Sequence, residues 1–132
     1  MEPFKVHILG CGSALPTLQH YASSQVVELR DKLFMIDCGE GTQIQLRRLR
    51  IHFSKIIALF ISHLHGDHCF GLPGMISTFG MTGRTAPMHL YAPAAFEPIL
   101  NQILDFFCQG LEFEIVFHTV DTTQSKVVYE DR

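Results

Sequence analysis

The stretch that decides the fold is IIALFISHLHGDH, residues 56–68. It begins with a continuous apolar run over residues 56–61, which is typical of a strand buried on both faces of a sheet. A polar loop follows directly, and it holds three histidines and one aspartate within residues 63–68. The sequence therefore predicts a buried strand that delivers a cluster of metal-binding side chains to one edge of a sheet.

The spacing within this loop suits two ions. In extended backbone, residues i and i+2 point the same way, so His63 and His65 can hold one ion together. Gly66 permits a sharp change of direction, after which Asp67 and His68 suit a second ion nearby. Imidazole and carboxylate ligands without a thiolate favour zinc, or manganese or iron, over calcium. A loop that is merely rich in polar residues is the plain alternative, which this density of ligand types disfavours.

Strands and helices alternate around the loop, so we predict an α/β fold. Strand-like runs cover residues 5–9, 25–29, 33–36, 56–61, 88–92, 113–117 and 126–129, and the turn 30–32 joins the second run to the third. Helical spacing predicts helices over 42–49, 71–79 and 93–104. Ile44, Leu46 and Leu49 are expected on the buried side of the first helix, and Pro98 fits only in the first turn of the last.

Composition bounds the class of protein. The 132 residues are 47% hydrophobic and 17% charged, which is enough apolar material for a core. The formal net charge of -3 excludes a strongly basic nucleic-acid module. A local basic cluster remains, formed by Arg47, Arg48, Arg50 and Lys55. It could contact RNA phosphates, although a solvated helix face is the preferred interpretation.

The cysteines and the apolar runs indicate a compartment. The four cysteines are widely spaced and form no CxxC pair, so we expect free, buried thiols in a reducing environment. We expect Cys69, beside His68, to be a packed thiol and not a ligand. No apolar run approaches the roughly 20 residues of a membrane helix, and the first residues lack the pattern of a signal peptide. These features predict a cytoplasmic protein that does not enter a membrane.

Four motifs carry a resemblance to a known family. HLHGDH at 63–68 resembles the HxHxDH signature of the metallo-β-lactamase superfamily. LGCGSALPT at 9–17, DCGEGTQIQL at 37–46 and GLPG at 71–74 narrow the resemblance to the ribonuclease Z family, endonucleases that remove the 3′ trailer from precursor tRNA. HxHxDH alone indicates only the superfamily, whereas the combination is much more specific.

The resemblance implies a role for each motif residue. His63 and His65 would bind one zinc ion, and Asp67 and His68 a second. Asp67 would also act in catalysis, as general base or as orienter of the attacking hydroxide. Asp37 would brace the histidine loop by hydrogen bonds, a task that supports metal ligands. The loop 13–24 would lie near the site, but many relatives carry arginine near the position of His20, and no substrate-binding residue is assigned.

The family fold is a four-layer αββα sandwich, and residues 1–132 resemble only its amino-terminal half, a mixed sheet with flanking helices. In the family, a third histidine for the first zinc, an aspartate that bridges both ions and a final histidine come later in the sequence, as does the arm that grips the tRNA. None of these motifs occurs between residues 97 and 132. We therefore expect the remaining ligands beyond Arg132, a chain that is inactive alone, and a homodimer as in many relatives.

Three functions remain open at this stage. The favoured one is a zinc-dependent endoribonuclease that acts on precursor tRNA through two metal ions. The second is another hydrolase of the superfamily, of the phosphodiesterase or arylsulfatase type. The third is a non-catalytic half-domain that assembles with a partner, and its support is the absence of half of the ligands.

Overall fold

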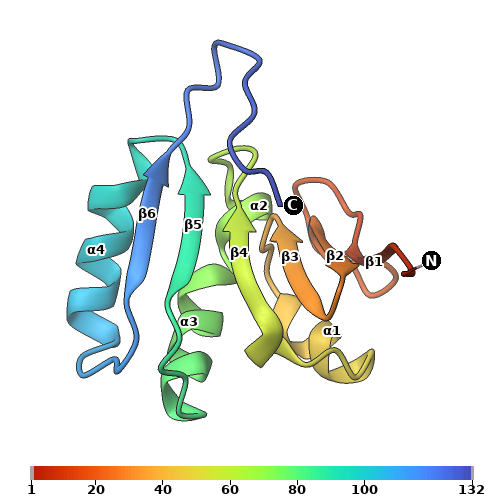
Figure 1. Ribbon diagram of the computed structural model, residues 1–132, viewed down its shortest axis with the longest axis horizontal. Helices are drawn as coiled ribbons and strands as arrows, with labels where there is room; N and C mark the ends of the chain where they lie inside the picture. Colours follow the sequence, from red (N-terminus) through yellow and green to blue (C-terminus); the bar gives the residue numbers. More distant parts are fainter. Residues whose placement is uncertain (1, 132) are drawn as a thin grey trace.

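A mixed six-stranded sheet organises residues 2–131, the part of the chain that the computed structural model describes (Figure 1). The strands lie side by side in sequence order: β1 (Lys5–Gly10), β2 (Ser24–Leu29), β3 (Lys32–Ile36), β4 (Ile56–Phe60), β5 (Met88–Ala92) and β6 (Ile115–Thr119). The first three strands pair antiparallel, and β3 to β6 pair parallel. The predicted α/β class is confirmed.

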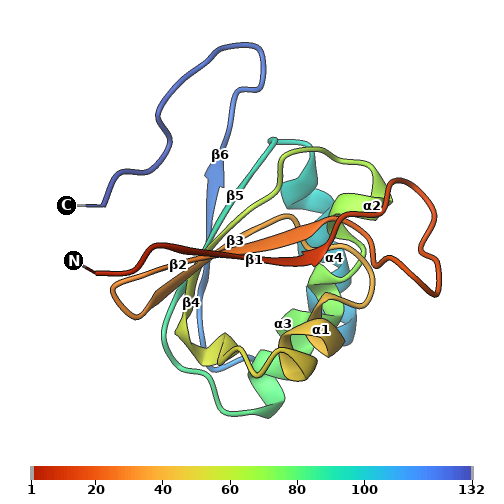
Figure 2. The same cartoon turned by 90° about the vertical axis from the view of Figure 1, so that its right-hand side faces the viewer.

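The helices connect the parallel strands and cover one face of the sheet (Figure 2). They are α1 (Thr42–Arg48), α2 (Gly66–Cys69), α3 (Leu72–Met81) and α4 (Phe96–Phe107), with a short 3₁₀ helix at Phe53–Lys55 before β4. Crossovers between parallel strands share one hand, and the strand order never reverses, so successive helices fall on the same face. The opposite face carries no helix among the described residues.

The core lies between the sheet and these helices. Leu59 of β4 and Leu90 of β5 point into it and are fully buried. Leu72, Ile76 and Phe79 recur at helical spacing along α3 and are buried against them. The apolar run that decides the fold is therefore the central strand of the sheet, as the sequence predicts.

The hairpin between β2 and β3 turns at Arg30 and Asp31, where both residues have positive φ, 53° and 59°. Two such residues make a tight hairpin loop whose twist matches that of the strands. Lys32 accordingly starts β3 opposite Leu29, one residue earlier than the sequence indicates.

The segment after β6 returns across the open face of the sheet (Figure 2). Tyr129 packs there on an aromatic cluster, with its ring centroid 5.3 Å from Phe34 and 6.2 Å from both Phe60 and Tyr91. The predicted strand at 126–129 is wrong, because these residues lie over the rings of the sheet and pair with no strand.

Smaller predictions also need correction. In α1, Thr42 and Leu46 are buried, whereas Ile44 and Leu49 are 46% and 49% exposed, because α1 meets the core with a narrow face. All four cysteines are free, as expected, but Cys11 is exposed and Cys108 only half-buried. Cys69 is a packed thiol as predicted. Among residues 2–131, no helix is both long enough and apolar enough to cross a bilayer.

Two glycine motifs meet directly beneath the histidine loop. The Gly71 N–H donates to Cys38 O at 2.9 Å, and the Cys38 N–H donates to His68 O at 2.8 Å. A methyl group on Gly71 would collide with the carbonyl oxygen of Gly39. Backbone therefore packs on backbone here, and no larger residue fits at position 71.

We expect Gly71→Ala to lower the free energy of unfolding by about 2–3 kcal/mol, because the methyl group must displace backbone. Gly74→Ala is the matched control in the same motif. There, an added Cβ would meet only the flexible end of Gln43, at 3.2 Å, so a change within about 1 kcal/mol is expected. Denaturant unfolding of both variants measures the difference, and equal stabilities would contradict the proposed close packing.

Candidate functional site

The site forms at the edge of the sheet where the parallel strands end. The segment 61–68 follows β4, and Asp37 follows the neighbouring strand β3. Ligand sites of parallel sheets lie at this edge, because the carboxyl ends of the strands converge there. The loop 11–23 reaches the same edge from β1, which runs parallel in direction to β3 because two antiparallel pairings separate them.

Asp37 is the hydrogen-bonding centre of the site, and its side chain is only 5% exposed. Its Oδ1 accepts bonds from the backbone N–H and the hydroxyl of Ser62, both at 2.8 Å. Its Oδ2 accepts from Ser23 Oγ at 3.2 Å and from His68 Nδ1 at 2.7 Å. The carboxylate thus ties the ends of three segments together, and it fixes the proton of the His68 ring on Nδ1.

His63 and His65 point toward each other, as expected for residues i and i+2 of extended chain. His63 Nε2 and His65 Nδ1 are hydrogen-bonded at 2.7 Å, and the two rings stand nearly perpendicular, with their centroids 4.0 Å apart. Both side chains are exposed at the rim of the sheet. They form the first ligand-type pair.

Asp67 and His68 form the second pair, from the short helix α2. His68 Nε2 lies 3.5 Å from Asp67 Oδ2, and the His68 ring centroid is 5.2 Å from that of His63. The Ala14 N–H donates to Asp67 Oδ2 at 2.9 Å, and this bond lowers the pKa of the Asp67 carboxyl, with a smaller contribution from His68. Asp67 is therefore ionised at neutral pH.

The spacing within each pair fits a shared cation. Two ligands of a tetrahedral zinc ion lie about 3.3 Å apart, given metal–ligand distances of about 2.0–2.2 Å. The Asp67–His68 pair, with 3.5 Å between His68 Nε2 and Asp67 Oδ2, is close to this spacing. The His63–His65 pair needs to open by about half an ångström. Within residues 2–131, however, no three ligand-type side chains gather around one point.

Sequence reasoning missed several contacts of the site. The backbone N–H of Ala14 and the hydroxyl of Ser23 come from the loop 11–23, and nothing in their residue types indicates a bond to a distant aspartate. Ser62, immediately before His63, is the one partner that a strand-end position could have suggested. His89 and His118, which lack any partner spacing in sequence, form a 2.8 Å hydrogen bond between β5 and β6 on the open face of the sheet.

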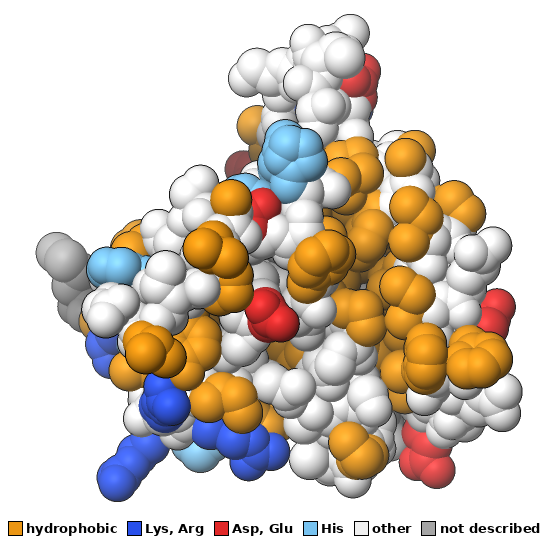
Figure 3. All heavy atoms as spheres, turned by 180° about the vertical axis from the view of Figure 1, so that it is seen from behind, with side chains coloured by type: hydrophobic (Ala, Val, Ile, Leu, Met, Phe, Trp, Pro, Cys, Tyr) orange, Lys and Arg blue, Asp and Glu red, His pale blue; other side chains and the backbone are white. Residues whose placement is uncertain are grey.

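The basic cluster lies before β4, whereas the histidine loop follows the other end of this strand. In Figure 3, lysine and arginine side chains gather at one lower corner of the helix face, and histidine atoms appear beside them, at the left and near the upper edge. Two of the arginines are engaged within the fold: Arg48 Nη1 donates to Tyr21 Oη at 2.7 Å, and the Arg47 guanidinium lies 5.3 Å from the centre of the Phe53 ring. The cluster thus behaves as a helix face that packs on aromatic rings.

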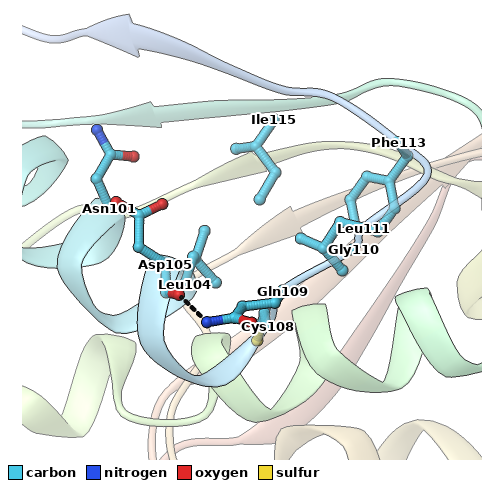
Figure 4. A pocket seen from close by; sticks show the side chains of 9 residues that line it. All are labelled: Asn101, Leu104, Asp105, Cys108, Gln109, Gly110, Leu111, Phe113 and Ile115. Carbon is cyan, nitrogen blue, oxygen red and sulfur yellow. Dashed lines mark hydrogen bonds between the residues drawn. The ribbon is translucent and has the colours of Figure 1, made fainter.

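A hollow also lies between the end of α4 and β6, far from the strand ends that carry the histidine loop (Figure 4). It has a volume of about 400 Å³, and Gln109 Nε2 donates across it to Asp105 O at 3.2 Å. Its other walls are mostly aliphatic and aromatic, including Leu104, Leu111 and Phe113. Its titratable lining residues are Asp105 and Cys108, and no histidine lines it, so the histidine loop remains the candidate site.

Comparisons with known proteins identify a family and several relatives that match this chain. The family model described as "Anti-Pycsar protein Apyc1" matches residues 4–128. A protein named ribonuclease Z from Bacteroides fragilis is 63% identical over all 132 residues, and one from Phocaeicola vulgatus is 58% identical. The chain spans 43% of the length of each of these relatives.

Solved structures share the fold. The crystal structure of human tRNase Z, short form, matches with a TM-score of 0.80 and 34% sequence identity, over 90% of this chain and 45% of that one. The metallo-β-lactamase fold protein YhfI from Bacillus subtilis matches with a TM-score of 0.67 and 20% identity, over 89% of this chain and 46% of that one. The predicted metallo-β-lactamase fold, of which the chain covers about half, is confirmed.

We expect Asp37→Ala to lower the free energy of unfolding by about 2 kcal/mol, because it leaves the partly buried donors of Ser62 and His68 without their acceptor. Asp37→Asn keeps one acceptor oxygen, so its loss is smaller. Its amide group then faces His68 Nδ1 as a donor, which moves the ring proton to Nε2. Denaturant unfolding and ¹⁵N NMR of the His68 ring measure the two effects.

Asp105→Ala, on the exposed surface of α4, serves as the control for loss of a carboxylate. If Asp37→Ala were as stable as this control, Asp37 would not hold the site together. If the ring proton stayed on Nδ1 in Asp37→Asn, Asp37 would not set the tautomer.

Proposed function

The chain belongs to the family described by the Apyc1 model, and from its metallo-β-lactamase fold and its ribonuclease Z relatives we propose a metal-dependent endoribonuclease. The proposed reaction removes the 3′ trailer from precursor tRNA by hydrolysis of one phosphodiester bond, which leaves a 3′-hydroxyl on the tRNA. Residues 1–132 would supply the amino-terminal portion of the catalytic domain. The relatives are more than twice as long, so the activity is proposed for a chain extended to their length, called here the extended protein.

The observation that carries this proposal is the pairing of ligands at one strand edge. His63 with His65, and Asp67 with His68, form two adjacent pairs, and Asp37 braces the second pair from behind. Two neighbouring cation positions suit phosphodiester hydrolysis, because a pair of cations can stabilise the charge that develops on both the attacking and the leaving oxygen. A bound pair of zinc ions would supply Lewis acidity and an activated hydroxide there. The remaining ligands are proposed to come from the portion that the relatives possess in addition.

The residues of this chain would orient the nucleophile. Asp67 Oδ2 is held by the Ala14 N–H, which leaves Oδ1 free to accept a hydrogen bond from the attacking water. Because its pKa is lowered, Asp67 stays ionised and accepts that bond at neutral pH. Ala14 has a positive φ of 58°, so the loop 11–23 adopts a costly backbone conformation at the residue that holds Asp67.

Partners and compartment follow from the same proposal. The substrate would be precursor tRNA, and the extended protein would act as a cytoplasmic homodimer, as inferred from resemblance. The Ile44 and Leu49 side chains that α1 leaves exposed are consistent with an association surface.

A non-catalytic role for the chain on its own is the second candidate. It is favoured by the finding that, within residues 2–131, each candidate ion has only two protein ligands in reach, whereas a catalytic zinc usually has three. This candidate concerns residues 1–132 alone and is compatible with catalysis by the extended protein.

We expect Asp67→Ala in the extended protein to lower the cleavage rate of precursor tRNA about 10³-fold, since a positioned acid or base contributes about 10²–10⁴-fold. Unfolding and metal content are measured in parallel, and Asp105→Ala is the control. Near-normal turnover by Asp67→Ala would remove this residue from the mechanism. Turnover of a small phosphodiester but not of precursor tRNA by the unmodified protein would favour a different hydrolase of the superfamily.

We expect the 132-residue chain alone to show no zinc-dependent cleavage of precursor tRNA above background, because each ion would lack its third ligand. Incubation of purified chain with zinc and labelled precursor, followed by gel electrophoresis, measures this. Robust trimming by the pure chain would show that the two pairs suffice.

A further inference from the structure

A pocket opens directly beside the histidine loop, and the proposed metal ligands form only part of its wall. Its volume is about 450 Å³, within the range of about 300–1,000 Å³ that is usual for ligand pockets. Its lining includes Ala14, Pro16, Glu40, His65, Asp67 and Phe70. The proposed cleavage chemistry uses Asp67, His65 and the Ala14 N–H but gives no role to Pro16, Glu40 and Phe70.

Phe70 is the least expected of these walls. Its side chain is 75% exposed, although it lies one residue after the buried Cys69 and two after the ligand-type His68. The ring nevertheless has a fixed support, because it lies against Gly66, where a methyl group would collide with its edge. One side of the ring rests on the histidine loop, and the exposed side is available to a ligand.

Away from the proposed metal ligands, the lining of the pocket offers no positive charge to a phosphate group. The charged lining residues are Glu40 and Asp67, both acidic, and no lysine or arginine lines it. Within residues 2–131, Glu40 makes no hydrogen bond or ion pair, so its acceptor oxygens are available to a ligand. A flat, neutral group that carries hydrogen-bond donors suits such a pocket, and the base of a nucleotide is such a group.

We propose that Phe70 stacks an unpaired base that flanks the scissile phosphate, so that the pocket beside the histidine loop is a nucleotide subsite. The inference rests on the proposed endoribonuclease function and adds to it the part of the substrate that this chain recognises. Single-stranded RNA ends are commonly bound in this way, with unstacked bases on aromatic side chains. Stacking tolerates every base, because each base presents a π-face.

The test compares three variants of the extended protein: Phe70→Ala, Phe70→Tyr and Phe106→Ala. Phe106 is the matched control, since it is also 75% exposed but lies on α4, outside the pocket. Phe70→Ala is expected to lower kcat/KM for precursor tRNA about 5- to 100-fold, mainly through KM, as expected for loss of one stacked base. Phe70→Tyr should retain the rate, and Phe106→Ala should leave it unchanged.

Substrates with an abasic site on either side of the scissile bond separate stacking from a general effect on the fold. Removal of the stacked base should slow the unmodified protein by the same factor as Phe70→Ala, and it should slow Phe70→Ala no further. A second readout needs no turnover: with metal removed by a chelator, fluorescence of 2-aminopurine at the same position should be quenched by binding to the unmodified protein and to Phe70→Tyr, but not to Phe70→Ala.

The possible outcomes distinguish failure of the stacking subsite from failure of the proposed endoribonuclease function. If the unmodified protein cleaves precursor tRNA while Phe70→Ala matches Phe106→Ala, the stacking subsite is wrong and the proposed function stands. If the abasic substrates slow all variants equally, the base is read elsewhere and the subsite is also wrong. If the unmodified protein cleaves no precursor tRNA, both proposals fail.

Discussion

The buried carboxylate of Asp37 joins parts of the chain that are remote in sequence. Ser23 comes from the loop before β2, Ser62 from the end of β4, and His68 from α2, and all three donate to this one side chain. A carboxylate with several donors is stable in a nearly dry position, whereas its removal leaves each donor unpaired. Asp37 therefore holds the His68 ring and the Ser62 backbone at the start of the loop, and the backbone bond from the Cys38 N–H to His68 O adds a second anchor.

The motifs that resemble ribonuclease Z are one structural unit. Gly39 lies in the motif at 37–46 and Gly71 in the motif at 71–74, and their backbones touch beneath the histidine loop. An added Cβ on Gly39 would also lie 2.6 Å from the Asp67 carbonyl oxygen. The physical basis of the combined signature is therefore the close approach of three backbone segments, which only glycine permits, and not the chemistry of each motif alone.

The sequence predicted the fold where local pattern and burial agree. The apolar run 56–61 gave the central strand, and the i, i+2 spacing brought His63 to His65. The prediction failed where long-range packing decides the conformation of a segment. Residues 126–129 have the pattern of a strand, but Tyr129 packs on aromatic rings of the sheet face instead. The contact of Ala14 with Asp67 could not be predicted, because a backbone N–H carries no sequence signal.

The ligand pairs and the bare sheet face have a common cause in the topology. Because β1 to β6 follow one another without reversal, the connecting helices cover one face, and the other face keeps an aromatic surface that, within residues 2–131, only the segment 120–131 crosses (Figure 2). The same order places the ends of β3 and β4 side by side, and the segments that follow these two ends supply Asp37 and the two ligand pairs. In the proposed extended protein, the portion that the relatives possess in addition would supply the further ligand that each ion needs.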